Sequence, residues 1–456
     1  MTEEQIIKLM GDYNNNVTSQ ILADQIATNS EASTYQALYE RYNGDVPILS
    51  RTFEDENKIN RQIANDFRGD IVDNAVGYMF GKPIQYSYEN GTEEQIKKIQ
   101  DWLKKNNIEK LDAETGEYMI ATGYAGRLLY NVEGEIKVMN LKPWEFKVIR
   151  DSTTDEVIYA MIYYQIELVG ENGQSIYETR VEWYDKKNVY VFVGDGGQFS
   201  LDDSIGQNPI QHTFDFVPVI DFENNSNRQG DFVKVESLID AYDIVTSDSQ
   251  NEFEEFRQAY MIFKNAEVNP DDVAKGRKLG VINIRSTSTT PAEVSFLTKQ
   301  VDVNMIKDLK ETLNRNIYKF SGSVDMSDEK FSGQQESGIS RLYKIQALEN
   351  KTVKRERYYI QGLREMFKVL FSAWSKQGLS LNYLDMAFKF NRNLPSDMIY
   401  IGSTVNSLKG TVSDKTLLGL IPGINVEEEI KRKEEELTDA INLNDVSLDE
   451  TNDITV

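Results

Sequence analysis

The chain of 456 residues contains no cysteine and a single histidine. The absence of cysteine excludes disulfides, thiolate metal sites and cysteine nucleophiles. His212 alone supplies too few ligands for most zinc sites and no basis for most histidine-based catalytic triads. We therefore predict no catalytic residue, no cofactor and no metal site.

Long apolar runs and an excess of positive charge are also missing. No apolar run approaches the length needed to cross a bilayer. The first residues, MTEEQIIKLMGDY, lack a basic segment followed by an apolar core, so we expect no signal peptide and assembly in the cytoplasm. The 50 Lys and Arg are outnumbered by 74 Asp and Glu, a net charge of -24. Binding to nucleic acid requires clustered cations, so any DNA contact is expected to be local and weak.

With 40% hydrophobic residues the chain is apolar enough to fold, and long enough for more than one folded unit. Apolar residues recur with helical spacing across 57–80 and predict one long helix that ends before Gly81 and Pro83. A short strand at 84–88 and two helices at 93–106 and 109–122 are expected to follow.

Residues 127–219 are rich in aromatic and β-branched residues separated by turn signals, which predicts a mainly antiparallel sheet. After a loop that ends before Asp231, the pattern becomes mostly helical. The predicted fold class is α+β, mainly α.

Two helices are predicted at 231–257 and 303–320, separated by a compact insertion with the strand-like segments YMIFK, VINI and EVSFL. The first helix carries carboxylates on its polar face and the second carries cations, which favours lateral contact between them. Solvated faces without specific partners are an equally open alternative, because exposed ion pairs contribute only about 0–1 kcal/mol. The charged residues in question are Glu236, Asp240, Asp243, Lys307, Lys310 and Arg315.

The stretch SGSVDMSDEKFSGQQESG, residues 321–338, contains too few large apolar residues for a core element and is expected to form a surface loop. A long helix is predicted from about Gly338, with a bend at Gly362. Its predicted apolar stripe runs through Ile339, Leu342, Tyr343, Ile360, Leu363, Phe367, Leu370 and Trp374. Its basic segment KRERYY is expected to be a solvated face with the tyrosines turned toward the core. Two shorter helices, broken at Pro422 and Gly423, are expected near the end of the chain, followed by a disordered acidic tail.

Three helical segments carry a family resemblance. They are NKINRQIANDFRGDIVDNAVGYMFGKPI, ESGISRLYKIQALENKTVKRERYYIQGLREMFKVLF and TVSDKTLLGLIPGINVEEEIKRKEEEL. With the order of the elements, they make the chain resemble portal proteins of tailed, siphovirus-type bacteriophages of Gram-positive hosts over about residues 30–440. In that family a ring of subunits sits at one capsid vertex, and double-stranded DNA enters and leaves through it.

The resemblance implies a division of the chain into the parts of a portal-type fold. In order these are an N-terminal arm (1–30), a wing (31–230), stem helix 1 (231–258), a clip (259–302), stem helix 2 (303–322), a tunnel loop (323–337), a long helix with the return to the wing (338–409), crown helices (410–440) and the tail (441–456).

The resemblance also implies function and partners. The expected function is DNA packaging and ejection as a homo-oligomer of about 12 (12 or 13) subunits in the virion. The expected partners are double-stranded DNA, the terminase large subunit, a head-completion or adaptor (neck) protein, and the major capsid and scaffolding proteins. The residues expected to face DNA from the loop are Ser323, Lys330, Ser332, Gly333, Gln334, Gln335 and Glu336.

Two alternatives belong to other classes. A carboxylate-based hydrolase would fit the aromatic-rich strands and the abundant acids, but no stretch singles out a pair of carboxylates. An oligomeric scaffold or tail component would share the ring-forming helices but would not depend on the loop. The chain has no GxxxxGKS/T phosphate loop, so a packaging ATPase must be a separate partner.

Overall fold

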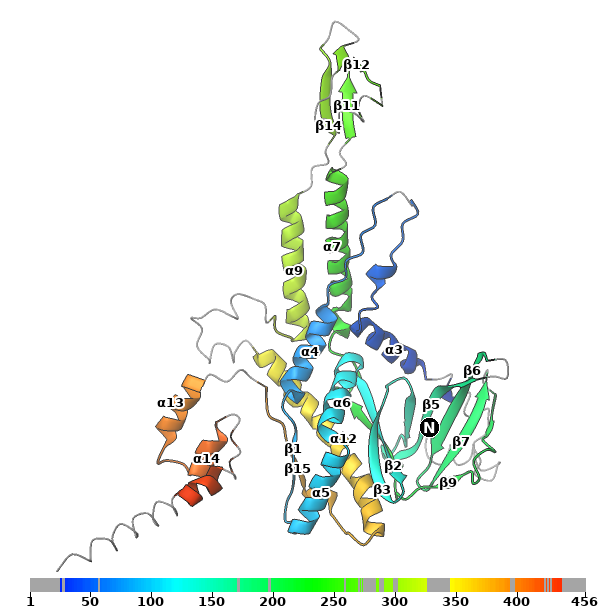
Figure 1. The fold of residues 1–456 in the computed structure, drawn as a ribbon, viewed down its shortest axis with the longest axis vertical. Helices are drawn as coiled ribbons and strands as arrows, with labels where there is room; N and C mark the ends of the chain where they lie inside the picture. The colour runs from blue at the N-terminus through cyan, green and yellow to red at the C-terminus, as the bar shows by residue number, and fades with distance from the viewer. Residues whose placement is uncertain are drawn as a thin grey trace, which may run out of the picture. The chain divides into compact units, whose positions relative to one another are not determined.

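Contacts divide the chain into two units, which we describe separately. Unit 1 comprises Met1–Met326 and Ile345–Arg392, and unit 2 comprises Ser327–Lys344 and Asn393–Val456. The computed structural model in Figure 1 describes residues 25–26, 29–55, 58–169, 173–195, 198–257, 260–269, 271, 273, 284–286, 291–297, 302–325, 345–393, 398–421, 424, 426 and 429–436. In these ranges, no helix combines the length and the apolar character that a membrane span requires.

The first part of unit 1 is helical. Its elements are α3 (Ser30–Tyr42), the short 3-10 helix η1 (Pro47–Ser50), α4 (Phe67–Phe80), α5 (Glu93–Lys105) and α6 (Ile108–Thr122). The predictions for α5 and α6 are confirmed. A capping box at Thr92 and Gln95 starts α5, since each side chain bonds the other residue's backbone N–H.

The prediction of one helix over 57–80 is wrong in its first half. Residues 58–66 have no helical backbone, and α4 begins at Phe67, where the Asp66 carboxylate accepts a hydrogen bond from the Gly69 N–H. The apolar spacing at Ile59 and Ile63 suggested helix, but both side chains are only half-buried. The backbone of this segment instead bonds to a neighbouring helix, described below.

Antiparallel sheets follow, as predicted for this region. The strand order β10-β2-β3 forms a three-stranded sheet, and β4-β5-β6-β7-β8 forms a larger sheet with β9 paired to β7. The bounds are β2 (Tyr124–Val132), β3 (Glu135–Leu141), β4 (Phe146–Arg150), β5 (Val157–Val169), β6 (Ser175–Tyr184), β7 (Asn188–Asp195), β8 (Gln198–Leu201), β9 (Ile210–Gln211) and β10 (Val219–Glu223). A separate pair joins β1 (Gln85–Tyr88) to β15 (Met386–Lys389), which follows the 3-10 helix η3 (Tyr383–Asp385).

The long helix α12 (Gln346–Lys376) packs on β10 and supplies much of the core. The predicted apolar stripe is buried at Leu363, Phe367, Leu370 and Trp374. The predicted start near Gly338 lies outside the described residues. No observation tests a bend at Gly362, but the structure gives this glycine another role. A Cβ there would lie 2.5 Å from the Phe222 ring and 3.1 Å from the Asp221 carbonyl oxygen.

Replacing Gly362 with alanine is therefore expected to destabilise the protein, although alanine favours helix by about 1 kcal/mol. Overpacking a tight site costs about 1–3 kcal/mol, so we expect a net loss of about 1 kcal/mol. Gly77 in α4 provides the control, because a Cβ there would meet nothing within 4 Å and Gly77→Ala should stabilise. Urea unfolding measures both variants. Stabilisation by Gly362→Ala would show that α12 and β10 do not approach so closely.

Two paired helices and an insertion complete unit 1 before the loop. The 3-10 helix η2 (Val233–Val235) leads into α7 (Glu236–Arg257), and α9 (Val303–Ser321) lies beside it, as Figure 1 shows. Between them in sequence, β11 (Tyr260–Lys264) pairs with β14 (Glu293–Leu297), and β12 (Ala266–Glu267) pairs with β13 (Arg285–Ser286). The predictions for YMIFK and EVSFL are confirmed. VINI lies outside the described residues except Ile284, which is not in a strand.

Unit 2 contains α13 (Met398–Leu408) and α14 (Asp414–Gly419). The Ser413 hydroxyl accepts a hydrogen bond from the Thr416 N–H and so caps α14. The helical residues 429–436 agree with the second predicted helix, whereas Pro422 and Gly423 lie outside the described residues. The sequence did not predict α13, because its β-branched residues and glycine are weak helix formers.

Candidate functional site

The α7 and α9 pair is the centre of the candidate site. Leu313 and Ile317 of α9 and Ile239 of α7 are buried. The Tyr242 ring makes an edge contact with Phe67 at 4.9 Å between centroids, and Lys310 Nζ lies 5.2 Å from the same Tyr242 ring. Apolar burial and the Lys310–Tyr242 contact therefore hold α7 and α9 together, and Phe67 joins α7 to α4.

The carboxylates predicted on α7 contact arginines from the preceding helices. The side chain of Arg68 in α4 is only 2% exposed and contacts three carboxylates of α7. Its Nη2 lies 2.5 Å from Asp240 Oδ1 and its Nε lies 3.5 Å from Glu236 Oε1. Its Nη1 lies 3.9 Å from Asp243 Oδ2. Arg41 of α3 forms a further ion pair with Glu236. Burial raises the pKa of Asp243, although hydrogen bonds from Asn65 and the charge of Arg68 oppose the shift.

The two helices lie side by side, as the opposite charges suggested, but these charged residues do not pair with each other across the contact. Lys307 pairs with Glu311 on its own helix at 3.7 Å, Lys310 lies over Tyr242, and Arg315 is exposed. The acids and the cations do not face each other because the acidic face of α7 is turned toward α3 and α4. The buried Arg68 was the sequence signal for this arrangement, since an arginine in a mostly apolar helix requires a buried partner.

An extended segment, residues 58–66, runs along α7 in the opposite direction. Its backbone N–H groups at every second residue bond α7 side chains spaced four residues apart, which satisfies their hydrogen-bonding capacity without a helix. The bonds join Arg61 N to Asn251 Oδ1 (2.7 Å), Ile63 N to Ser247 Oγ (3.0 Å) and Asn65 N to Asp243 Oδ1 (2.8 Å). The Arg61 side chain also pairs with Glu254, in the last turn of α7, with Nε 2.7 Å from Oε1.

A buried charge cluster joins α12 to the bases of both paired helices. Asp231, which precedes η2 and α7, lies 2.5 Å from Arg355 Nη2 and 2.9 Å from Lys351 Nζ. Lys351 Nζ also donates to the carbonyl of Ser321 at the end of α9, at 3.0 Å. Burial alone would raise the pKa of Asp231, but Arg355 and Lys351 hold it below its usual value. No local pattern in the sequence predicted this cluster.

The predicted loop begins where α9 ends. Gly322 takes a left-handed conformation with φ 72°, and the Ser323 N–H donates to Ser321 Oγ at 3.2 Å. Of the residues expected to face DNA, only Ser323 is described. Lys330, Ser332, Gly333, Gln334, Gln335 and Glu336 lie outside the described residues.

One side of α9 carries exposed apolar side chains. Met305 is 67% exposed, Leu309 41% and Phe320 57%, and helical spacing places them on the same side of α9 as the buried Leu313 and Ile317. Apolar side chains that stay exposed beside the buried part of α9 indicate a further contact surface.

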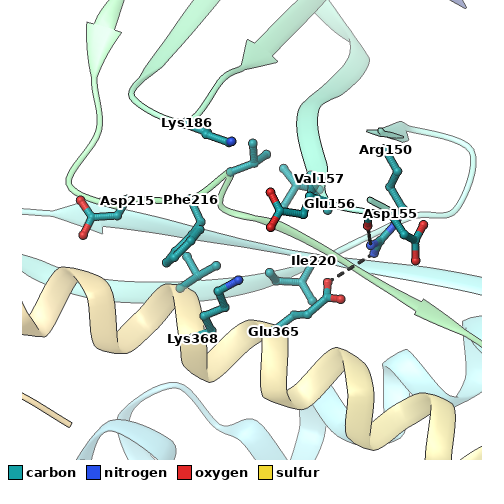
Figure 2. A pocket seen from close by; sticks show the side chains of 13 residues that line it. Arg150, Asp155, Glu156, Val157, Lys186, Asp215, Phe216, Ile220, Glu365 and Lys368 are labelled. Atoms are coloured by element: carbon teal, nitrogen blue, oxygen red, sulfur yellow. Dashed lines mark hydrogen bonds and ion pairs between the residues drawn. The ribbon is translucent and has the colours of Figure 1, made fainter. Parts of the chain in front are cut away.

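A cavity of about 210 Å³ lies beside α12 (Figure 2). Figure 2 shows Glu365 and Lys368 on α12, with the Glu365 carboxylate 3.3 Å from Arg150 Nη2. Burial raises the pKa of Glu365, although Arg150 opposes the shift. Lys368 Nζ lies 4.3 Å from the Phe216 ring centroid. Throughout the described ranges, His, Asp and Glu do not gather in threes as a metal site requires.

Comparisons with known proteins agree with the resemblance seen in the sequence. The family model described as "Phage portal protein, SPP1 Gp6-like" matches residues 25–443. The portal protein of Bacillus phage SPP1 is 26% identical over 405 residues, covering 84% of this chain and 77% of that protein. The portal protein of Clostridium phage phiCD119 is 24% identical over 399 residues, covering 83% and 86%. A match of this extent shows that the chain belongs to the SPP1 Gp6-like family of phage portal proteins.

Proposed function

We propose that this portal protein forms a closed ring of about 12 (12 or 13) subunits through which double-stranded DNA is packaged and ejected. The observation that carries the ring is the exposed apolar stripe of α9, Met305, Leu309 and Phe320, on the same side of the helix as the buried Leu313 and Ile317. A homo-oligomer with cyclic symmetry buries such a stripe against the neighbouring copy in every subunit.

The dimensions of such a ring suit a duplex. About twelve helices side by side at roughly 9–10 Å spacing give a circle of axes about 37 Å across. Subtracting about 10 Å for the helices leaves a bore of ~27 Å. This width exceeds that of a B-form duplex by a small margin, so α7 and α9 are proposed as the stem that surrounds the DNA.

The loop at 323–337 is proposed to project into this bore. Its composition supports weak contact, because Ser332, Gln334 and Gln335 offer neutral hydrogen-bonding groups instead of a row of phosphate-binding cations. Each phosphate neutralised by Lys or Arg adds salt-dependent affinity, and a conduit that held the duplex tightly would stall it. The proposed residues in contact with DNA therefore favour sliding.

The remaining parts are proposed to contact other components of the particle. The insertion at 259–302 would be the clip that docks the terminase large subunit during packaging and a neck protein afterwards. The wing (31–230) would meet the major capsid and scaffolding proteins, and residues 410–440 would form the crown. The protein would assemble in the host cytoplasm and remain in the virion at the portal vertex.

Glutamates at Met305 and Leu309 test the ring directly. Burial of each side chain contributes about 1.5–3 kcal/mol, so Met305→Glu with Leu309→Glu should weaken subunit association by more than about 100-fold. Native mass spectrometry should show about 12 or 13 subunits for the wild type and mainly monomers for the variant.

Lys97→Glu on α5 is the matched control, since it changes net charge by the same amount and Lys97 is exposed. We expect this control to keep the mass of the ring. A double variant that assembles as well as the wild type would show that the α9 stripe is not a subunit contact.

A further inference from the structure

The exposed face of α12 carries a row of four cationic side chains and one amide. Lys354, Arg357, Gln361 and Arg364 are exposed, and Lys368 continues the row as a half-buried residue. Their spacing of three or four residues places them on one side of the helix. At 1.5 Å per residue the row extends about 21 Å.

The charges of α12 are divided between two sets. Three of its acidic residues form ion pairs: Arg392 pairs with both Glu349 and Glu356, and Arg150 pairs with Glu365. By contrast, in the part of the chain that the structure describes, Lys354, Arg357 and Arg364 form no ion pair. The result is a local positive surface on a chain with a net charge of -24.

The neighbouring residues show that this row is distinct from the rest of the basic segment. Arg355 and Lys351 lie on the inner side of α12 and bind Asp231. Tyr359 is fully buried. The expectation of a solvated face with a tyrosine turned to the core therefore holds for Lys354, Arg357 and Tyr359.

The composition of the row favours a phosphate backbone over a protein surface. Its five members all carry N–H donors, and none is a carboxylate or a large apolar residue. Protein interfaces concentrate aromatic and apolar residues at their centre, whereas contacts to a nucleic-acid backbone use arginine, lysine and amide side chains.

We propose that the outer face of α12, formed by Lys354, Arg357, Gln361, Arg364 and Lys368, binds the phosphate backbone of duplex DNA without sequence preference. This inference rests on the proposed function, because that function is the reason to take duplex DNA as the ligand. It does not depend on which residues line the bore. It adds a polyanion contact on the wing side of the protein to the neutral contacts proposed for the loop. A local cationic surface retains DNA electrostatically even where the whole particle is acidic.

The test compares the full-length ring with a variant carrying Lys354→Gln, Arg357→Gln and Arg364→Gln. Fluorescence anisotropy of a labelled duplex of random sequence is measured between about 50 mM and 200 mM salt. Each phosphate contact contributes about 0.9 to the slope of log affinity against log salt. The variant should therefore bind at least tenfold more weakly and show a slope shallower by up to about 2.7 for each subunit in contact.

Lys97→Gln, Lys104→Gln and Lys137→Gln form the matched control, because these exposed lysines lie on α5 and β3 and their loss changes the net charge equally. The control should retain wild-type affinity and slope. Equal losses in both variants, or none in either, would overturn the proposal. Unchanged DNA binding with a ring that dissociates in salt would also overturn it and would assign the row to a subunit contact. Electron micrographs of the same samples show separately whether rings form.

Discussion

Replacing Arg355 with methionine is expected to lower the free energy of unfolding by about 3–5 kcal/mol. Methionine fills similar space but leaves the Asp231 carboxylate, whose side chain is 2% exposed, without its nearest cation. It also removes the bond from Arg355 Nε to Asn224 Oδ1 at 2.6 Å. A buried charge that loses its partner costs far more than an exposed pair, so this substitution should exceed any surface change in the protein.

Arg357→Met serves as the control, since Arg357 is exposed two residues further along the same helix. It should change stability by no more than about 0.5 kcal/mol. Urea unfolding of both variants under identical conditions gives the comparison. Equal stabilities would show that the cluster around Asp231 is not buried as described.

The difference between wild type and Arg355→Met should depend on pH. The pKa of Asp231 is lowered in the folded protein despite its burial, because Arg355 and Lys351 stabilise the carboxylate. The ionised Asp231 therefore contributes to the free energy of unfolding above its unfolded-state pKa of about 3.9. This contribution is lost as the pH falls through the lower pKa of Asp231 in the folded protein. Stability curves of the two proteins should converge below about pH 4.

Removing residues 332–336 is expected to reduce DNA packaging by tenfold or more while rings still form. The proposed loop narrows the bore, so a shorter loop would no longer reach the moving duplex. The proposed subunit contact on α9 lies outside the deletion, so assembly should be unaffected. An in vitro packaging reaction with nuclease protection of DNA measures the loss, and native mass spectrometry measures the ring.

A five-residue Gly/Ser replacement of 332–336 is the control, because it keeps the length of the segment and adds no phosphate-binding cation. It should retain most packaging. If the shortened protein packages normally, the tunnel-loop role is wrong, and an oligomeric scaffold or tail component that does not pass DNA becomes the better interpretation.

Local signals predicted much of the architecture. Local residue patterns predicted α5 and α6, and the apolar spacing in α12 identified the buried Leu363, Phe367 and Trp374. Alternating aromatic and β-branched residues identified the antiparallel sheets. These patterns succeed because each element exposes one face and buries the other within its own short span.

Contacts between distant segments were not predictable in the same way. Residues 58–66 have a helix-like apolar spacing, but α7 side chains nearly 200 positions away supply acceptors for their N–H groups. Similarly, opposite charges suggested that α7 and α9 are neighbours, which they are, but the acids of α7 pair with Arg41 and Arg68 instead of with α9. A single sequence gives the sign of each charge but not the element it faces.

The most direct test of the central claim, a closed ring with a duplex-sized bore, is an electron microscopy image of the purified full-length protein. We expect rings of 12 or 13 subunits with a central opening wide enough for a double helix. Particles without an opening, or with one too narrow for duplex DNA in every class, would contradict the proposed conduit.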